Sequence, residues 1–312
     1  MEQFYAVLNQ VLIFLIIMII GFVAVKSKYL PESTLPIISG LFTRMIVPFL
    51  VFVNTVSGAT RADMRTYAYL VGVYICVFAV LITVSRFTPK LLRLKGNRAS
   101  LFSLATSFGN VGFVGIPLLL SVFGQRVMLF VTMYAVVDQM IFWTYGVSLT
   151  YPVDDRPKFR LSTLVNMINP PLIAIILAIV LILLNVRLPS IVDRAFTTMS
   201  NSGMALPFIY MGGVLATMNI KKLLKHYELY AIIFIKMITI PLCVFLVFRS
   251  MGLPQEIVMA STILFGLPTI GMTPMLASAN GSDAEYATVI VLVTTLASLL
   301  TLTFISYVTA LI

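Results

Sequence analysis

A cluster of helix-breaking residues around one amide side chain is the part of this sequence whose residue types and spacing could bind a small ligand. Residues 107–117 read SFGNVGFVGIP, so that three glycines and Pro117 surround Asn110 inside an apolar segment. Proline removes a backbone donor and frees a carbonyl, which inside a bilayer must meet water, protein or a ligand. A broken helix also exposes an N-terminus, whose amides and dipole favour anions. The pattern therefore predicts a polar site within a membrane helix, and this site favours anions.

A second cluster of the same kind lies in the other half of the chain. Residues 264–274 read LFGLPTIGMTP, and a shift of 157 residues aligns Phe108 with Phe265 and Pro117 with Pro274. Several positions agree at this single offset, which is close to half of the 312 residues. We therefore interpret the pair as an internal repeat rather than as a chance recurrence of glycine and proline.

We expect the two broken stretches to supply the contacts to a bound substrate. Asn110 can donate and accept hydrogen bonds, and Thr269 and Thr273 offer hydroxyls. Glycines also let membrane helices approach closely, so packing is the alternative role for this set. Asn54, in another apolar segment, is kept as a further contact. The candidate substrate-binding residues are Gly109, Asn110, Gly112, Gly115, Pro117, Pro268, Thr269, Gly271, Thr273, Pro274 and Asn54.

Three ionisable residues fall inside apolar segments, where each is costly unless it has a partner or a water-filled cavity. Asp138 and Lys236 are candidates for carrying a coupling proton or for forming a structural ion pair, and both roles stay open. Arg44 lies nearer to one membrane surface, and we expect its side chain to reach the interface. The three charges sum to +1, which favours an anionic over a cationic substrate.

The composition indicates a membrane protein. Hydrophobic residues make up 60% of the chain and charged residues only 10%, whereas a soluble domain has about 25% charged residues. The formal net charge of +10 is expected to lie in cytoplasmic loops, and we exclude nucleic acid as a partner. Cys76 and Cys243 lie in apolar runs and are predicted to be core residues, with no disulfide, metal or other cofactor. His226, the only histidine, is predicted to be solvated in a basic loop.

Ten segments are long and apolar enough to span the lipid bilayer. Lys26 and Lys28 follow the first segment in place of a small-residue cleavage site, so we expect it to remain as a membrane helix. Thirteen Lys and Arg residues lie in the connections after segments 1, 3, 5 and 7, against six after segments 2, 4, 6 and 8. The positive-inside rule therefore predicts that the first set is cytoplasmic and that both termini are outside. The segments are 8–25, 35–57, 67–85, 100–123, 127–150, 165–186, 196–218, 229–248, 257–279 and 287–312.

Five crossings in each half would turn the second half upside down relative to the first. The predicted organisation is a first five-helix repeat over residues 1–150, a cytoplasmic linker over 151–164 and a second, inverted five-helix repeat over 165–312. Inverted repeats with broken helices are typical of secondary transporters, whose substrate binds near the midplane where the repeats meet. We therefore predict an all-α membrane protein in which broken helices 4 and 9 cross.

The ordered set of motifs resembles the auxin efflux carrier family, which includes plant auxin exporters and bacterial malate and malonate permease-like proteins. The resemblance rests on Asn110 with GIPLL at 115–119, on NPPL at 169–172, on Lys236 followed by Pro241, and on the second broken stretch. It extends along essentially the whole chain, although no single motif is highly specific.

This resemblance implies that helices 4 and 9 cross and that an asparagine in the first break, here Asn110, contacts a substrate carboxylate. It also implies a scaffold of helices 1, 2, 6 and 7, a moving unit of helices 3–5 and 8–10, and elevator-type alternating access. Gly109 stands where the plant-type break has a proline, so the crossing is expected to differ in geometry from the plant type.

The predicted function is secondary active transport of a small organic anion, a carboxylate such as malate, malonate or an auxin-like acid, in the bacterial inner membrane. An enzyme is not expected, because the sequence has no HExxH motif and its lone histidine offers no serine–histidine dyad. The alternatives are a cation-coupled symporter or sodium–proton antiporter of the crossed-helix type, and a ligand-binding membrane sensor. Neither broken stretch holds an acidic residue, which disfavours the antiporter. A proton or a sodium ion is the expected coupling partner, and a homodimer stays open.

Overall fold

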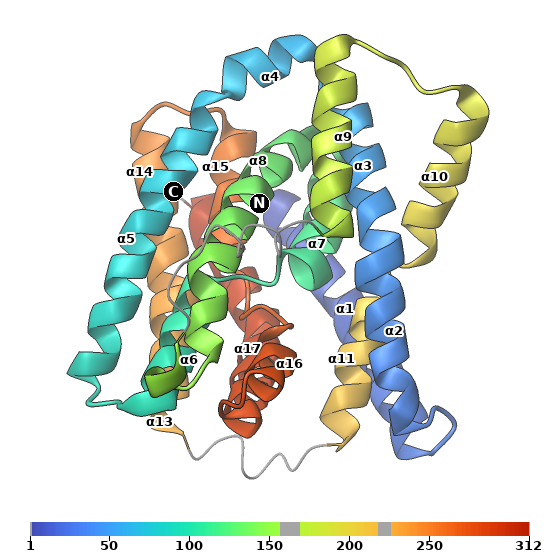
Figure 1. Ribbon diagram of the computed structural model, residues 1–312. Coiled ribbons are helices and arrows are strands. Elements are labelled where there is room, and N and C mark those ends of the chain that lie inside the picture. Colours follow the sequence, from blue (N-terminus) through green and yellow to red (C-terminus); the bar gives the residue numbers. More distant parts are fainter. Residues whose placement is uncertain (1, 157–168, 218–225, 312) are drawn as a thin grey trace.

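The computed structural model describes residues 2–156, 169–217 and 226–311, and every regular element in these ranges is a helix (Figure 1). The all-α class predicted from the sequence is therefore confirmed. Six stretches of the described chain are long and apolar enough to cross a bilayer. Ten crossings remain a prediction, because several predicted segments are divided into shorter helices. The six stretches are Phe4–Lys26, Glu32–Gly58, Tyr69–Leu91, Val111–Thr150, Tyr227–Ser250 and Ala284–Leu311.

Three predicted segments are single long helices. They are α1 (Glu2–Lys26), α5 (Tyr69–Leu91) and α17 (Ala284–Leu311). Helix α5 continues past its predicted end, so Arg86 and Lys90 are helical and not in a loop as predicted. The Nε of Arg86 donates a hydrogen bond to the hydroxyl of Tyr145 at 3.1 Å, and the ammonium of Lys90 lies over the ring of Phe87. Both charged side chains of this extension therefore have an aromatic partner.

Two predicted segments are interrupted at the stretches rich in glycine and proline. The first runs from α6 through a short link into η3 and α7, where η denotes a 3-10 or π-helical turn. The second runs from α15 through a link into α16. The bounds are α6 (Gly96–Ser107), η3 (Val111–Gly115), α7 (Ile116–Phe123), α15 (Gln255–Phe265) and α16 (Thr273–Ala279). Both breaks lie where the sequence predicts them.

Three π-helical turns are each followed, after one intervening residue, by a proline. A proline ring crowds the carbonyl four residues before it, and the wider π turn gives that carbonyl room. An irregular helical turn thus precedes each of the prolines Pro48, Pro117 and Pro241. One of these turns, η3, begins directly after Asn110. The turns are η2 (Phe42–Ile46), η3 and η9 (Ile235–Thr239).

Helices α1 and α11 (Leu206–Thr217) pack backbone against backbone. A Cβ atom placed on Gly212 would lie 1.8 Å from the carbonyl oxygen of Met18, and one placed on Gly21 would lie 2.3 Å from that of Ile209. No side chain fits at these distances, so glycine is required at both positions. This contact joins the beginning of the first half of the chain to the second half.

The seventh predicted segment, 196–218, is also divided, which the sequence analysis did not predict. Helix α10 (Ser190–Ser202) ends before Gly203, and α11 begins at Leu206. A Cβ on Gly203 would lie 2.4 Å from the Cδ1 of Ile46, so the absent side chain makes room for η2. Met218 lies outside the described residues, as does the start of the sixth predicted segment. The described part of that segment is α9 (Pro170–Leu184).

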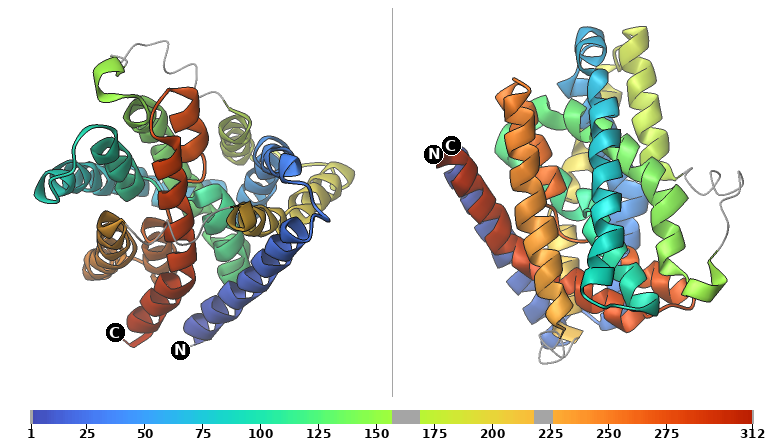
Figure 2. Two further views of the ribbon diagram at one scale, coloured as in Figure 1. Left: turned by 90° about the horizontal axis from the view of Figure 1, so that it is seen from below. Right: turned by 90° about the vertical axis from the view of Figure 1, so that its left-hand side faces the viewer.

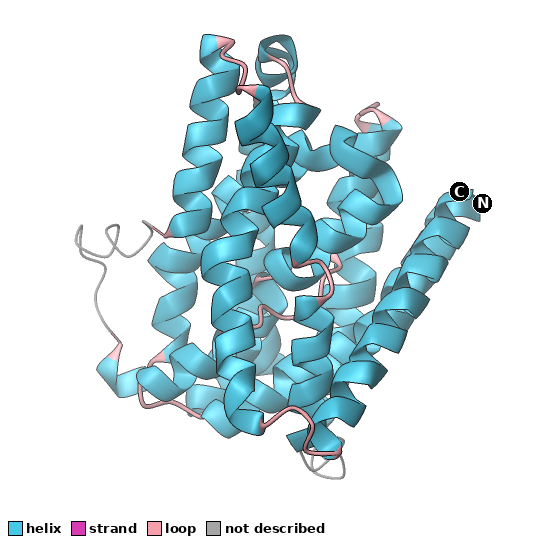
Figure 3. Ribbon diagram, turned by 90° about the vertical axis from the view of Figure 1, so that its right-hand side faces the viewer, coloured by secondary structure: helices cyan, strands magenta, loops and turns pink. Residues whose placement is uncertain are grey.

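Helices α1 and α17 lie side by side, with the two ends of the chain together (Figures 2 and 3). This agrees with an even number of crossings. Cys76 and Cys243, predicted to be core residues, are exposed free thiols. An apolar run in a membrane protein faces lipid as readily as the core, which explains that error. The remaining elements are α2 (Leu35–Leu41), α3 (Val47–Gly58), α4 (Arg61–Tyr67), α8 (Met128–Ile141), α13 (Tyr227–Phe234), α14 (Ile240–Ser250), η1 (Glu32–Thr34), η4 (Gly124–Val127), η5 (Phe142–Gly146), η6 (Val147–Thr150) and η7 (Val153–Asp155).

Candidate functional site

The two broken stretches meet in the interior of the protein. Gly109 and Thr269 form an isolated antiparallel bridge between the two links. The amide of Asn110 donates to the carbonyl of Pro268 at 2.8 Å, and the amide of Ile270 donates to the carbonyl of Phe108 at 3.3 Å. These reciprocal bonds satisfy backbone groups that the breaks release, which a bilayer interior demands. We call this contact between the two links the crossing.

Two aligned phenylalanines anchor the links at the crossing. Phe108 and Phe265 are both fully buried, at the ends of α6 and α15. The Phe108 ring lies 5.3 Å from that of Phe142, and the Phe265 ring lies 5.0 Å from that of Tyr134. Gly146 makes room for this packing, since a Cβ there would lie 2.8 Å from the Phe108 ring. The aromatic cluster fixes the positions at which the two helices stop.

Asn110 caps the helix that follows it and keeps one donor free. Its Oδ1 accepts a hydrogen bond from the amide of Phe113 at 3.2 Å, and its carbonyl accepts from the amides of Val114 and Gly115. Within the described residues its Nδ2 donates no hydrogen bond. This nitrogen faces Gly271, where an added Cβ would lie 3.3 Å away. Asn110 therefore offers an unused donor at the crossing.

The four candidate glycines fall into two groups. Gly109 and Gly115 are packing positions, because a Cβ on them would lie 3.0 Å and 2.7 Å from atoms of the Leu267 side chain. Gly112 and Gly271 are partly exposed, and nothing lies within 4 Å of a Cβ placed on Gly112. The amide of Gly112 belongs to the first turn of η3 and has no partner inside that helix. The open edge of the crossing is therefore formed by Gly112 and Gly271.

The threonines of the second stretch are committed to structural hydrogen bonds. The amide of Thr269 donates to the Oγ1 of Thr294 at 3.1 Å, and its hydroxyl donates to the carbonyl of Ala105 at 3.4 Å. The hydroxyl of Thr273 donates to the carbonyl of Ile270 at 2.8 Å. Sequence reasoning missed Thr294, because one threonine in a long apolar helix carries no signal of its own.

The candidate prolines lie at the edges of the crossing. Pro268 supplies the carbonyl that accepts the amide of Asn110. Pro117 is buried in the first turn of α7, and Pro274 is partly exposed in the first turn of α16. Asn54 does not lie at the crossing. Its Nδ2 donates to the carbonyl of Leu50 in the same helix at 2.7 Å and to the hydroxyl of Ser200 at 3.3 Å. The second of these bonds joins α3 to α10.

Asp138 and Lys236 are both buried and are not in direct contact. Their side chains are 1% and 0% exposed, and no ion pair within 4.0 Å joins them. One oxygen of Asp138 accepts a hydrogen bond from Gln139 at 3.4 Å. Among the described residues, its other oxygen and the ammonium of Lys236 have no hydrogen-bond partner. Arg44, in η2, is exposed.

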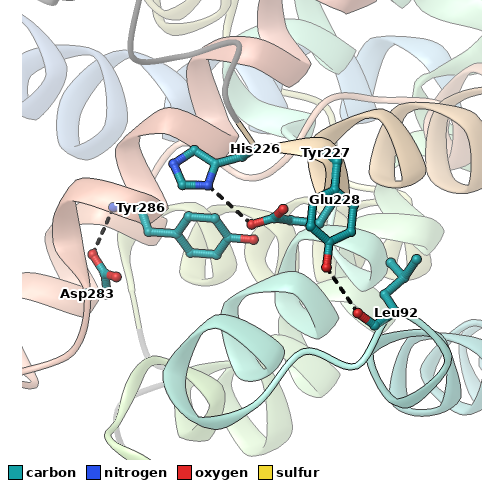
Figure 4. A network of polar contacts seen from close by, with 6 residues as sticks. All are labelled: Leu92, His226, Tyr227, Glu228, Asp283 and Tyr286. Carbon is teal, nitrogen blue, oxygen red and sulfur yellow. Dashed lines mark hydrogen bonds and ion pairs between the residues drawn. The ribbon is translucent and has the colours of Figure 1, made fainter.

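The only histidine does not stand free in solvent. The Nδ1 of His226 lies 3.3 Å from a carboxylate oxygen of Glu228 (Figure 4), and the side chain of His226 is 26% exposed. The prediction of a solvated histidine is therefore wrong. The prediction rested on the basic residues that precede His226 in the sequence. Those residues lie outside the described part of the chain.

Comparison with known proteins places nearly the whole chain in one family. The profile described as "Membrane transport protein" matches residues 6–306. An uncharacterized transporter of Methanocaldococcus jannaschii is 24% identical over 212 residues, which cover 66% of this chain and 68% of that protein. The uncharacterized transporter YfdV of Escherichia coli is 24% identical over 274 residues, 84% of each chain, and the Shigella flexneri protein of that name matches equally. Because the profile spans nearly the whole chain, this protein is a membrane transporter, not an enzyme, and it belongs to the membrane transport protein family, the auxin efflux carrier family that its motifs resemble.

Proposed function

We propose that this transporter carries a small organic anion, a carboxylate such as malate, malonate or an auxin-like acid, by secondary active transport. The anion binds at the crossing, on Asn110 and the neighbouring backbone amides. The proposed location is the bacterial inner membrane, with both termini outside.

The single observation that carries this proposal is the meeting of two helix N-termini beside a free amide donor. Asn110 is the N-cap of η3, and Gly271 directly precedes Met272, the N-cap of α16. First-turn amides have no partners inside their helices, and the helix dipole is positive at that end. The Nδ2 of Asn110 adds a donor, and neither broken stretch contains a carboxylate. Donors without a counter-charge favour an anion with two acceptor oxygens.

The open edge of the crossing supports a small ligand. Gly112 borders free space, and Gly271 is partly exposed. Glycine at both positions lets a carboxylate approach the backbone amides without meeting a side chain. Gly109, Gly115 and Thr269 then support the site from behind by packing and hydrogen bonding and do not contact the anion.

Alternating access is proposed to follow the elevator scheme, with two inverted five-helix repeats over 1–150 and 165–312. Helices α1–α3 and α9–α11 form the scaffold, and the remaining helices form the moving unit. Two of the contacts between the units are made by side chains and can be exchanged, although at Gly58 of α3 an added Cβ would lie 2.2 Å from the backbone oxygen of Gln125 in η4. The rings of Phe42 and Phe113 lie 5.0 Å apart, and the hydroxyls of Thr55 and Thr132 share a hydrogen bond of 2.6 Å. By contrast, the backbone contact of α1 with α11 stays within the scaffold.

Asp138 is our candidate for the coupling proton. A buried carboxylate needs a proton or an opposite charge close by. Asp138 has neither a direct ion pair with Lys236 nor a partner for its second oxygen within the described chain. Proton binding at Asp138 would remove the buried negative charge during one half of the transport cycle.

The experiment that tests this proposal is flux into proteoliposomes containing the purified protein. A panel of radiolabelled monocarboxylates and dicarboxylates is offered with no gradient, with a proton gradient and with a sodium gradient. We expect saturable flux of at least one carboxylate that a proton gradient increases.

Two outcomes would contradict this proposal. No carboxylate flux together with sodium–proton exchange would identify a cation antiporter. Saturable binding of a carboxylate without any flux would identify a ligand-binding sensor. Empty liposomes and liposomes with heat-denatured protein serve as controls.

A further inference from the structure

The side chain of Gln139 connects the buried carboxylate of Asp138 to a second helix. The Oδ2 of Asp138 accepts a hydrogen bond from the Nε2 of Gln139 at 3.4 Å. The Oε1 of Gln139 accepts two bonds, one from the Nε1 of Trp143 at 3.1 Å and one from the Nδ2 of Asn169 at 3.4 Å. Both polar atoms of the Gln139 amide are therefore engaged. We call Asp138, Gln139, Trp143 and Asn169 the Gln139 network.

The partners of Gln139 fix the orientation of its amide. An indole N–H can only donate a hydrogen bond, so the atom of Gln139 that faces Trp143 must be the oxygen. Asn169 requires the same orientation, because its Oδ1 already accepts the amide of Leu172 at 2.9 Å and its Nδ2 remains to donate. The nitrogen of Gln139 therefore faces Asp138, whose Oδ2 must act as the acceptor. A proton on Asp138 then belongs on Oδ1, which has no partner among the described residues.

The network extends from α8 to α9 and adjoins the crossing. Asp138 and Gln139 lie on α8, and Trp143 lies in η5, which continues α8. Asn169 is the N-cap of α9, and α9 contacts α8. Phe142, the residue before Trp143, packs against Phe108 at the crossing with their rings 5.3 Å apart. The bond between Gln139 and Asn169 therefore joins the helix that supports the crossing to α9.

The strength of the bond from Gln139 depends on the charge of Asp138. Hydrogen bonds to an ionised group are roughly twice as strong as bonds between neutral groups. The ionisable groups that interact electrostatically with Asp138 are Lys236, on η9, and Tyr134, one turn earlier on α8. Neither donates a hydrogen bond to Asp138 within the described chain. In that part of the chain Gln139 is thus the one hydrogen-bond partner of the carboxylate.

We propose that Gln139 is a positioning residue that transmits the charge of Asp138 to the contact between α8 and α9. This inference rests on the proposed function, in which Asp138 binds the coupling proton and α8 moves against α9. With Asp138 ionised, the strong bond holds Gln139 with its oxygen toward Asn169, and α8 stays against α9. When a proton binds to Oδ1, the carboxyl group becomes neutral and the bond from Gln139 weakens. Gln139 can then turn, and the contact with α9 is released.

The first test is the fluorescence of Trp143, the only tryptophan of the chain. Emission of the purified full chain is recorded from about pH 4 to about pH 9, a range in which buried carboxyl groups titrate. We expect the emission maximum of the wild type to shift to shorter wavelength as pH falls, because the indole loses a polar partner. The shift should be lost in Asp138→Asn, which cannot titrate, and in Gln139→Met, which keeps the length of the side chain without its amide.

Two results of this measurement would overturn the proposal. One is a wild-type emission that does not change with pH. The other is a shift that persists in Gln139→Met, since the charge of Asp138 would then act on the indole directly. Gln125→Met is the matched control, because Gln125 is an exposed glutamine in η4, and this variant should keep the wild-type shift. The melting temperature of each variant serves as the control for folding.

The second test uses a carboxylate that gives flux and the variant Asn169→Ser. Serine caps a helix as well as asparagine does, but its side chain is too short to reach Gln139. We expect the stimulation of flux by a proton gradient to fall about fivefold, the effect of one lost hydrogen bond, while the shift of Trp143 remains. Asn54→Ser is the matched control, because the amide of Asn54 joins α3 to α10 within the proposed scaffold. Unchanged stimulation in Asn169→Ser would overturn the proposal.

Failure of this inference can be distinguished from failure of the proposed function. If no carboxylate is transported, or if Asp138→Asn still responds to the proton gradient, the proposed function is wrong in that respect. The fluorescence of Trp143 still decides whether Gln139 responds to the charge of Asp138, because that measurement requires neither a substrate nor a gradient.

Discussion

The two broken stretches align along the sequence, yet they have different parts in the structure. At the 157-residue offset Asn110 aligns with Leu267, and Gly112 aligns with Thr269. Asn110 keeps its Nδ2 free and Gly112 borders open space, whereas Leu267 packs against the glycines of the first stretch and Thr269 bonds on both sides. In the proposed function, the first stretch therefore faces the ligand and the second stretch supports it. The predictions below test this division.

The largest effect is expected for Asn110→Asp. Aspartate retains the oxygen that caps η3 but replaces the free donor with an acceptor and adds a negative charge. We expect kcat/KM for carboxylate flux to fall by about 100-fold or more, because like charges brought together cost several kcal/mol. Proteoliposome flux measures this loss, and the melting temperature serves as the control for folding. Flux equal to that of the wild type would remove Asn110 from the site.

A smaller effect on total flux is expected for Asp138→Asn. This change removes the titrating group while keeping its size, so the stimulation by a proton gradient should disappear, a loss of about tenfold if the coupling has the usual strength. Flux without a gradient should persist. The matched control is Thr295→Val: Thr295 aligns with Asp138 at the same offset, and its buried hydroxyl, like one oxygen of Asp138, has no hydrogen-bond partner among the described residues. If Asp138→Asn still responds to the proton gradient, the proton is carried elsewhere.

A few-fold effect is expected for Gly271→Ala. The added methyl group would lie 3.3 Å from the Nδ2 of Asn110, close enough to displace the amide. We expect KM to rise about threefold with little change in kcat, since the position of one donor is altered and not removed. Gly112→Ala is the companion variant, because its methyl group meets no protein atom within 4 Å. It should fold normally, and a change in KM there would come from contact with the anion itself.

The smallest effect on transport is expected for Thr269→Val. The substitution keeps the shape of the side chain and removes one hydrogen bond to the carbonyl of Ala105. The free energy of unfolding should fall by about 1 kcal/mol, whereas KM should change less than twofold. Chemical unfolding and flux on the same preparation measure the two quantities. A large rise in KM without a loss of stability would mean that the second stretch also binds the ligand.

Local chemistry made the breaks and their repeat predictable from the sequence. Proline and glycine act on their own helix, so the ends of α6 and α15 follow from the residues next to them, and the 157-residue offset pairs the two breaks. The division of the seventh predicted segment at Gly203 could not be predicted in this way. It depends on packing against the side chain of Ile46, which lies far away in the sequence.

The assignment of roles within the site was less predictable, because it depends on tertiary contacts. Nothing in the glycine pattern separates Gly112, which borders open space, from Gly115, which packs against Leu267. Asn54 has the same chemistry as Asn110, yet its amide bonds to Ser200. Glu228 is likewise buried only in the tertiary structure, where its helix α13 contacts α6 and α17.

The backbone contact between α1 and α11 has a consequence for how the protein is made. Met18 cannot meet Gly212 until nearly two hundred further residues have left the ribosome. At roughly 5–20 residues per second this delay is roughly 10–40 s. During that time α1 resides in the membrane without α11. The face of α1 that later packs against α11 is then in contact with lipid or with the insertion machinery. Glycine substitutions in this contact should therefore reduce the yield of assembled protein in cells before they alter any property of the finished transporter.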